Sequence, residues 1–151
     1  MVKEIAWPGR TYLTRRARIA FDKLPAFFGE TYAALFHALS ERGLPPQGMP
    51  AAIYYHVDEK SNNTDLAAAV PVPADMKAVE GFELVHVPQG RALQMELAGP
   101  YDGMHAAYAT MEAHMKKAGL RPRLMMEEYL NDPGAVADPS EIRTNIIWTV
   151  E

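Results

Sequence analysis

The sequence contains no cysteine, and this absence removes several classes of protein at once. Without a thiol there is no disulfide scaffold, no thiolate metal site and no cysteine nucleophile. Histidine is sparse as well, and none of the five histidines stands in a His-Glu-x-x-His or comparable metal-binding spacing. A Gly-x-Ser-x-Gly elbow, a phosphate-binding glycine loop and a dinucleotide fingerprint are also missing. We therefore expect neither a metal ion nor a cofactor.

Long apolar runs and an excess of positive charge are absent too. No stretch of 18 apolar residues occurs, and residues 1–8 (MVKEIAWP) lack the apolar core of a signal peptide, which predicts a cytoplasmic protein with no membrane partner. Fifteen Lys and Arg face 19 Asp and Glu, so direct binding to nucleic acid is not expected. The cluster Arg15, Arg16 and Arg18 would be split between two faces of a strand and is expected at a solvated strand edge.

The composition that remains is that of an ordinary globular protein. Hydrophobic residues make up 48% and charged residues 23% of the chain, which excludes a disordered tail. A chain of 151 residues is long enough to bury roughly two-thirds of its unfolded surface without disulfides or metals. We expect a single domain over residues 1–151.

The most informative feature is an internal repeat with an offset of 76 residues. Each copy has apolar residues at i, i+4, i+7 and i+11, which form one stripe of a helix. Each stripe ends at a glycine followed by proline, as expected where a helix terminates. Each half therefore contains one amphipathic helix. The offset pairs Phe28 with Met104, Tyr32 with Tyr108, Leu35 with Met111, Leu39 with Met115, and Gly43 with Gly119.

Alternating apolar and polar residues predict strands around each helix. One strand precedes the helix and a hairpin follows it in both halves, a short extra strand lies between the halves, and Trp7 precedes the first strand, where it is expected to cover a sheet edge. The predicted strands are 12–20, 51–57 and 64–72 in the first half, 82–87 between the halves, and 91–98, 124–130 and 143–150 in the second half.

Two strand–helix–strand–strand units predict an α+β fold. We expect them to join about a pseudo-two-fold axis into one mostly antiparallel sheet with two long helices on one face. The first repeat covers about residues 10–73 and the second about residues 81–151. The segment 73–81 connects the two repeats and is short, which favours one domain.

Four segments of the second half carry a resemblance to a known family. They are AGPYD at 98–102, GL at 119–120, EEYLNDP at 127–133 and EIRTNI at 141–146. In this order and context the chain resembles the gyrase-inhibitor-like (GyrI-like) domain, which is also the effector-binding domain of some AraC- and MerR-type transcription regulators. The resemblance extends over nearly the whole chain.

The resemblance implies a cleft between the two helices that binds lipophilic and often cationic compounds. It also places a carboxylate two residues before the strand tyrosine in this cleft, which is Glu127 here. The transcription regulators carry an additional helix-turn-helix domain, for which the residues before the first strand leave no room. A stand-alone binding protein is therefore expected.

Strand alternation is a second reason, independent of the resemblance, to consider Glu127 as a ligand-facing residue. It places Met125, Glu127 and Tyr129 on one face of the strand and Glu128 on the other. A carboxylate among Met and Tyr side chains costs several kcal/mol to bury unless it is paired, hydrogen-bonded or protonated. Glu127 is thus the candidate ligand-facing group, and Glu128 is expected to face solvent. A reversed register would exchange the two roles.

The remaining candidates have both a binding and a packing interpretation. Tyr32 and Tyr108 occupy equivalent helix positions and either pack in the core or line two walls of a cleft. Trp148 is either a wall or a core residue. The methionines Met104, Met111 and Met125 suit an adaptable ligand lining or an adaptable core. In the first repeat the counterpart of Glu127 is Ile53, so the charge belongs to the second half alone.

Three functions are compatible with these residues. The first is capture of a lipophilic, possibly cationic small molecule in a cleft that contains Glu127. The second is hydrolysis of cyclopropane-type genotoxic compounds, with Glu127 as general base. The resemblance implies it because some stand-alone proteins of the family look like hydrolases of such compounds. The third is a gyrase-binding inhibitor, which the family name suggests but few residues support.

Overall fold

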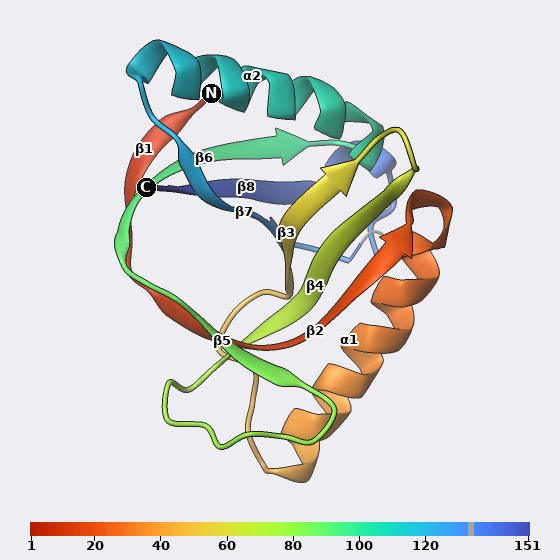
Figure 1. Ribbon diagram of the computed structural model, residues 1–151. Helices are drawn as coiled ribbons and strands as arrows, with labels where there is room; N and C mark the ends of the chain where they lie inside the picture. The colour runs from red at the N-terminus through yellow and green to blue at the C-terminus, as the bar shows by residue number, and fades with distance from the viewer. Residues whose placement is uncertain (133–134) are drawn as a thin grey trace. The chain divides into compact units, whose positions relative to one another are not determined.

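The computed structural model describes residues 1–132 and 135–151, and its elements form the predicted α+β fold (Figure 1). The two long helices are α1 (Leu24–Glu41) and α2 (Met104–Ala118). Short 3-10 turns occupy Phe21–Lys23, Tyr101–Gly103 and Pro139–Glu141. The strands are β1 (Lys3–Trp7), β2 (Arg10–Ala20), β3 (Ala51–Asp58), β4 (Asn63–Val72), β5 (Glu83–Val87), β6 (Gly90–Ala98), β7 (Pro122–Tyr129) and β8 (Arg143–Val150).

The chain divides into two compact parts, each built from four strands and one long helix. The α1 unit contains residues 9–88, with strands in the order β3-β4-β2-β5. The α2 unit contains residues 1–8 and 89–151, with strands in the order β1-β6-β8-β7. Pairing inside each unit is antiparallel.

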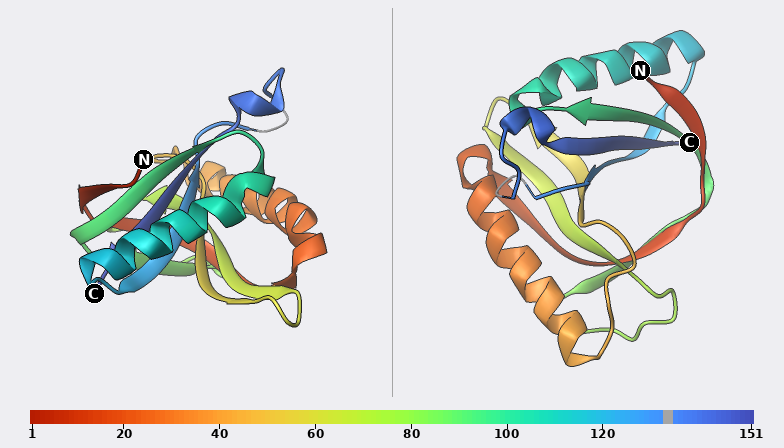
Figure 2. Two further views of the ribbon diagram at one scale, coloured as in Figure 1. Left: turned by 90° about the horizontal axis from the view of Figure 1, so that it is seen from above. Right: turned by 180° about the vertical axis from the view of Figure 1, so that it is seen from behind.

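Each helix covers one face of the strands of its own unit (Figure 2). Helix α1 contacts β2 and β4, and α2 contacts β6. The predicted helix stripes supply the buried residues, with Leu35 and Leu39 under α1 and Met111 and Met115 under α2. Among the described residues, neither helix is long and apolar enough to cross a membrane.

The two long helices end with the same backbone geometry. Gly43 has φ 66° and Gly119 has φ 69°, the left-handed conformation expected after a helix. The N–H of Leu44 donates to the carbonyl of Leu39 at 3.0 Å, and the N–H of Leu120 donates to the carbonyl of Met115 at 2.9 Å. The two helices therefore terminate in the same way 76 residues apart.

The N-terminal strand was missed by the sequence analysis. Trp7 does not precede the first strand but ends β1, opposite Gly90 of β6, and is only 3% exposed. β1 precedes β2 in sequence yet pairs with β6, while β5 precedes β6 yet pairs with β2. β1 is five residues long and begins with Lys3 and Glu4, so its alternation of apolar and polar residues is weak. Its partner, β6, also lies far from it in the sequence.

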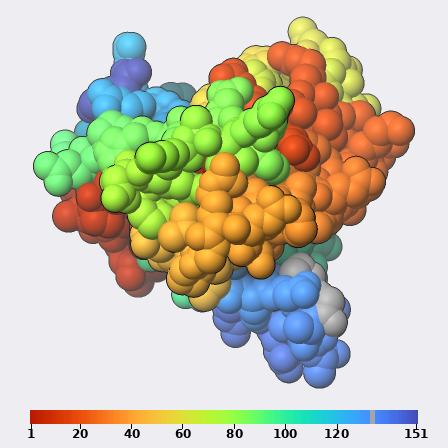
Figure 3. All heavy atoms as spheres, turned by 90° about the horizontal axis from the view of Figure 1, so that it is seen from below, coloured from red at the N-terminus to blue at the C-terminus, as the bar shows by residue number. Residues whose placement is uncertain are grey.

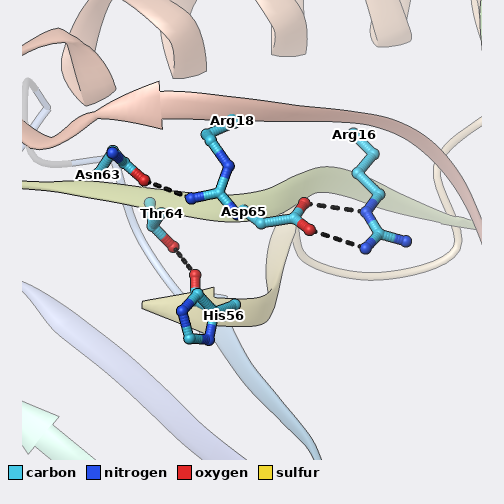
Figure 4. Close-up of polar contacts among 6 residues, drawn as sticks. All are labelled: Arg16, Arg18, His56, Asn63, Thr64 and Asp65. Carbon is cyan, nitrogen blue, oxygen red and sulfur yellow. Dashed lines mark hydrogen bonds and ion pairs between the residues drawn. The ribbon is translucent and has the colours of Figure 1, made fainter. Parts of the chain in front are cut away.

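The arginine cluster lies at an unpaired edge of β2, as expected, because the pairing of β2 with β5 covers only Arg10–Thr14 and the described residues beyond it pair with β4 alone. Arg16 donates to both carboxylate oxygens of Asp65 at 2.9 and 2.8 Å, and Arg18 donates to Asn63 at 2.6 Å (Figure 4). The Arg16 guanidinium also lies 3.9 Å from the centre of the Tyr55 ring. These arginines are thus engaged with neighbouring strands inside the α1 unit.

The connector between β4 and β5 lies on the surface of the α1 unit (Figure 3, lime green). Most of residues 73–82 are exposed or half-buried. Phe82 is partly buried and packs against the α1 core, and the Arg15 guanidinium lies 4.4 Å from the centre of its ring. Met76 and Val79 pack against the same core, so the connector contacts the α1 unit at several points along its length.

Candidate functional site

The site is built on one face of β7, the strand that carries both glutamates. Across the ladder with β8, Met125 lies opposite Trp148, Glu127 opposite Ile146 and Tyr129 opposite Thr144. Directly opposed residues of an antiparallel pair share a face of the sheet. Because Ile146 and Trp148 pack in the cluster under α2, Glu127 faces the same helix. This is the face on which strand alternation placed Glu127.

Glu127 is a buried carboxylate held by two tyrosines. Its side chain is 5% exposed. The Tyr108 hydroxyl, from α2, donates a short hydrogen bond to Oε2, and the Tyr129 hydroxyl, from the same strand, donates to Oε1 at 2.9 Å. No Lys or Arg of the described chain forms an ion pair with it. Both oxygens are thus hydrogen-bonded, while the charge has no counter-ion.

Burial raises the pKa of Glu127 above its usual value, because removing the carboxylate from water disfavours its charged form. The two tyrosine hydroxyls oppose this shift by stabilising the carboxylate. Burial, followed by the charge of Glu127, also raises the pKa of Tyr101. Glu127 consequently keeps its proton to a higher pH than an exposed glutamate.

Each of the two tyrosine rings contacts another aromatic ring. Trp148 is 3% exposed and meets the Tyr108 ring edge to face, with 5.5 Å between ring centres. Tyr101 meets Tyr129 in the same manner at 6.0 Å and is 42% exposed. Tyr101 was not among the predicted site residues, although it belongs to the Gly-Pro-Tyr segment that carried the family resemblance.

The three candidate methionines are all in the α2 unit, in two settings. Met111 is fully buried in the core cluster under α2. Met104 and Met125 are partly buried and pack against the same cluster. Met111 is therefore a core residue, whereas Met104 and Met125 lie at the margin of the cluster, where an adaptable side chain can contact a ligand.

Two buried polar atoms on this face of β8 have no hydrogen-bond partner within the described chain. They are the Nε1 of Trp148 and the Oγ1 of Thr144. Thr144 is completely buried. A buried donor without a partner costs about 1–3 kcal/mol, so these atoms are unusual in a folded protein.

The expectation that Glu128 faces solvent is wrong. Its side chain is 7% exposed and accepts a hydrogen bond from Asn145 at 3.2 Å. Its neighbour on the same face, Met126, is fully buried. Both faces of β7 are therefore covered, which strand alternation alone does not reveal. Glu128 differs from Glu127 in that it faces away from α2.

Tyr32, the counterpart of Tyr108, lies in the α1 unit and has a different partner. Its ring stacks on Phe28 with 5.7 Å between centres, and its hydroxyl donates to the backbone carbonyl of Ala51 at 2.5 Å. The structure thus gives Tyr32 a packing contact and a backbone acceptor where Tyr108 has a carboxylate.

The assignment of Ile53 as the counterpart of Glu127 was displaced by one residue. Ile53 lies opposite Ala67, while Ala52 lies opposite Ala68, which belongs to the cluster under α1. Ala52 and Tyr54 therefore share the face of β3 that is directed toward α1, whereas Ile53 faces the other way. The register of β3 shifts between Tyr54 and His56, and such a bulge inserts one residue that an ungapped alignment cannot show. Neither Ala52 nor Tyr54 is a carboxylate, so the first repeat has no counterpart of the Glu127 charge at these positions.

Other surface features do not include Glu127. One shallow hollow lies beside β1 and β6 and is lined by residues 4–7 and 89–91. Another, in the α1 unit, is lined by Arg10, Gln47 and His86 among others. Within the described residues, no group of three acidic or histidine side chains is arranged to hold a metal ion.

Comparisons with solved structures show where this fold occurs. The EcmrR–DNA complex has a TM-score of 0.81 and 19% identity over 100% of this chain and 56% of the EcmrR chain. A hydrolase encoded by lin2189 from Listeria innocua has a TM-score of 0.71 and 18% identity over 99% and 91% of the two chains. SAV2435 bound to tetraphenylphosphonium has a TM-score of 0.70 and 10% identity over 100% and 94%. The chain thus spans little more than half of EcmrR, and at these identities the likeness establishes the fold.

Comparison by sequence identifies the family. No curated protein matches the chain. The family model of the GyrI-like small molecule binding domain matches residues 2–151, which is nearly the whole sequence and includes the buried carboxylate and its tyrosines. The chain therefore belongs to the GyrI-like family of small-molecule-binding domains.

Proposed function

We propose that this protein captures a lipophilic cation at the face of β7 that carries Glu127. The observation on which the proposal rests is a 5% exposed carboxylate that has two tyrosine donors but no counter-ion in the described chain. A charge in this position is expensive to maintain in the empty protein. A ligand that brings a positive charge into contact with it offsets that cost.

The surrounding rings define the rest of the ligand. Tyr108, Tyr129 and Trp148 present aromatic surface close to Glu127, and Met104 and Met125 add flexible apolar contacts. Aromatic faces attract cations, and more strongly where water is excluded. An ion with a large apolar body is therefore preferred over a small hydrated ion such as ammonium or potassium.

The comparisons support the same ligand class. SAV2435, whose fold is similar, is described as bound to tetraphenylphosphonium, a cation enclosed by four phenyl rings. The low identity of the two chains means that this support concerns the fold rather than individual residues. The residue-level proposal rests on the surroundings of Glu127.

The test compares Glu127→Gln with Glu128→Gln, the same substitution one residue away on the opposite face of β7. The probes are tetraphenylphosphonium and the uncharged triphenylphosphine oxide, with affinities measured by calorimetry at neutral pH. We expect Glu127→Gln to weaken the cation at least about tenfold, equivalent to about 1.4 kcal/mol. Glu128→Gln should retain the affinity of the unaltered protein.

The neutral probe separates charge from packing. Triphenylphosphine oxide should bind the unaltered protein and Glu127→Gln with similar affinity, because Gln preserves the shape of the side chain. Equal affinities of the unaltered protein and Glu127→Gln for tetraphenylphosphonium would show that the carboxylate does not contribute to cation binding.

A second function is supported by the likeness to a protein described as a hydrolase. Glu127 in its charged form can act as a general base on water, and a tyrosine hydroxyl within hydrogen-bonding distance can assist the leaving group. For a cyclopropane-type substrate, product formed over several turnovers and abolished in Glu127→Gln would favour hydrolysis. Stoichiometric binding without product would favour capture.

A further inference from the structure

The indole N–H of Trp148 is a second polar group of the same site. Trp148 is 3% exposed, and its Nε1 has no hydrogen-bond partner within the described chain. Its ring contacts Tyr108, whose hydroxyl donates to Glu127. The unpaired donor therefore belongs to a residue in direct contact with the group that holds the carboxylate.

An indole N–H can only donate, so it requires an acceptor from elsewhere. Buried donors without a partner are rare because each costs about 1–3 kcal/mol. In a binding site the cost is removed when a ligand supplies the acceptor, and ligands that lack the acceptor are then disfavoured.

Thr144 provides a comparison on the same strand. Its hydroxyl is also buried and unpaired within the described residues, but it lies four residues from Trp148. Four strand residues span about 13 Å, so one compact acceptor cannot reach both groups. Thr144 lies opposite Tyr129 in the ladder, whereas Trp148 contacts the ring of Tyr108, which donates the short hydrogen bond to Glu127. The contact with Tyr108 therefore favours Trp148 as the donor.

From this geometry we propose that the ligand carries a hydrogen-bond acceptor beside its positive charge, and that the acceptor binds the Trp148 N–H. The inference rests on the proposed capture of a lipophilic cation and narrows its ligand class. Cations bearing a carbonyl or ether oxygen near the charge are preferred over purely hydrocarbon cations of the same size and charge.

The test uses two quaternary ammonium ions that differ by one group. Phenacyltributylammonium has a carbonyl where (2-phenylethyl)tributylammonium has a methylene, and the two share the permanent charge, the phenyl ring and the three butyl chains. The carbonyl ion should bind the unaltered protein about five- to tenfold more tightly, the ratio expected for one hydrogen bond. In Trp148→Phe the ratio should fall to about one, and in Thr144→Val it should be unchanged.

A direct signal comes from the indole resonances, because the chain contains two tryptophans, Trp7 and Trp148. In a ¹⁵N–¹H spectrum of the unaltered protein, the carbonyl ion should move the Trp148 indole proton downfield. The phenylethyl ion should not, and the Trp7 indole, assigned with Trp7→Phe, serves as the internal reference. This measurement decides the proposal even if Trp148→Phe does not fold.

The outcomes are distinct. Three results would each overturn the inference. The two ions bind the unaltered protein with equal affinity, or the preference for the carbonyl ion persists in Trp148→Phe, or this preference disappears only in Thr144→Val. If Glu127→Gln still weakens both ions in these cases, the proposed function stands without it. Binding of neither ion to the unaltered protein overturns both.

Discussion

At the scale of single residues, the raised pKa of Glu127 connects stability to pH. A carboxyl whose pKa is higher in the folded chain holds its proton more firmly there than in the unfolded chain. Its contribution to stability is therefore fully present below the ordinary glutamate pKa, and it is lost as the pH rises toward the raised value. Above that value the folded protein bears the whole cost of the buried charge.

Glu127→Gln should accordingly stabilise the protein at neutral pH. The gain in free energy of unfolding over the unaltered chain should be smallest near pH 4. It should grow by at most about 1.4 kcal/mol per pH unit between the ordinary glutamate pKa and the raised pKa of Glu127. Urea unfolding between pH 4 and pH 8 measures this difference. Glu128→Gln is the control, and an advantage of Glu127→Gln that did not change with pH would contradict the assignment.

Tyr108 and Tyr32 test whether the carboxylate alters the role of an equivalent tyrosine. Tyr108→Phe removes a donor to Glu127, so the pKa of Glu127 should rise further and the pH at which cation binding begins should move upward. Tyr32→Phe removes a donor to the carbonyl of Ala51 and should cost about 1 kcal/mol of stability without moving that pH. Titrating tetraphenylphosphonium at several pH values separates the two effects. An identical pH profile for both variants would refute the distinction.

The surroundings of Glu127 could be predicted in part. Strand alternation placed Glu127 and Glu128 on opposite faces of the strand, and the family resemblance selected Glu127 as the carboxylate of the candidate site; the ladder with β8 shows that Glu127 faces α2. The burial of Glu128 and the contact of Tyr101 with Tyr129 were not predicted. Both depend on what covers β7 and on how the helix start approaches it, and neither is encoded in local periodicity.

At the scale of elements, the glycines after the two helices should behave alike. Gly43 and Gly119 both have positive φ, and a Cβ added to either would meet no atom within 4 Å. Replacement by Ala should therefore cost only the backbone penalty, about 1 kcal/mol each. Gly29, inside α1, also has free space around its added Cβ but no positive φ, so Gly29→Ala should stabilise by about 0.5–1 kcal/mol. Thermal unfolding of the three variants provides the comparison, and the same sign for all three would be inconsistent with it.

The elements also show where sequence patterns are sufficient. The two helix stripes span four turns or more and end at glycines, so their positions could be predicted closely. β1 has five residues and two of its first three positions are exposed charges, which leaves too short a pattern to recognise. The shift of register between Tyr54 and His56 displaced the match between the repeats by one residue. Short strands and bulges are specified by pairing partners rather than by their own residues.

At the scale of the whole molecule, the two units do not simply follow one another along the chain. The chain begins in the α2 unit, passes through the α1 unit from residue 9 to residue 88, and returns at residue 89. The pairings on either side of the crossing are Trp7 with Gly90 and Arg10 with Val87. The α2 unit is thus assembled from two segments that the α1 unit separates in sequence, and β1 joins it by pairing with β6.

Trp7 should consequently support the α2 unit, although the chain that follows from residue 9 belongs to the α1 unit. Because it is 3% exposed, Trp7→Ala should cost about 3–5 kcal/mol. Hydrogen exchange measured by mass spectrometry should show the larger loss of protection in peptides from β6, the partner of β1, and the smaller loss in peptides from β2. Leu13→Ala, in the core under α1, is the matched control and should reverse this order. If Trp7→Ala instead exposed β2 first, the N-terminal strand would support the α1 unit, and the division of the chain into an α2 unit built from both termini would be wrong.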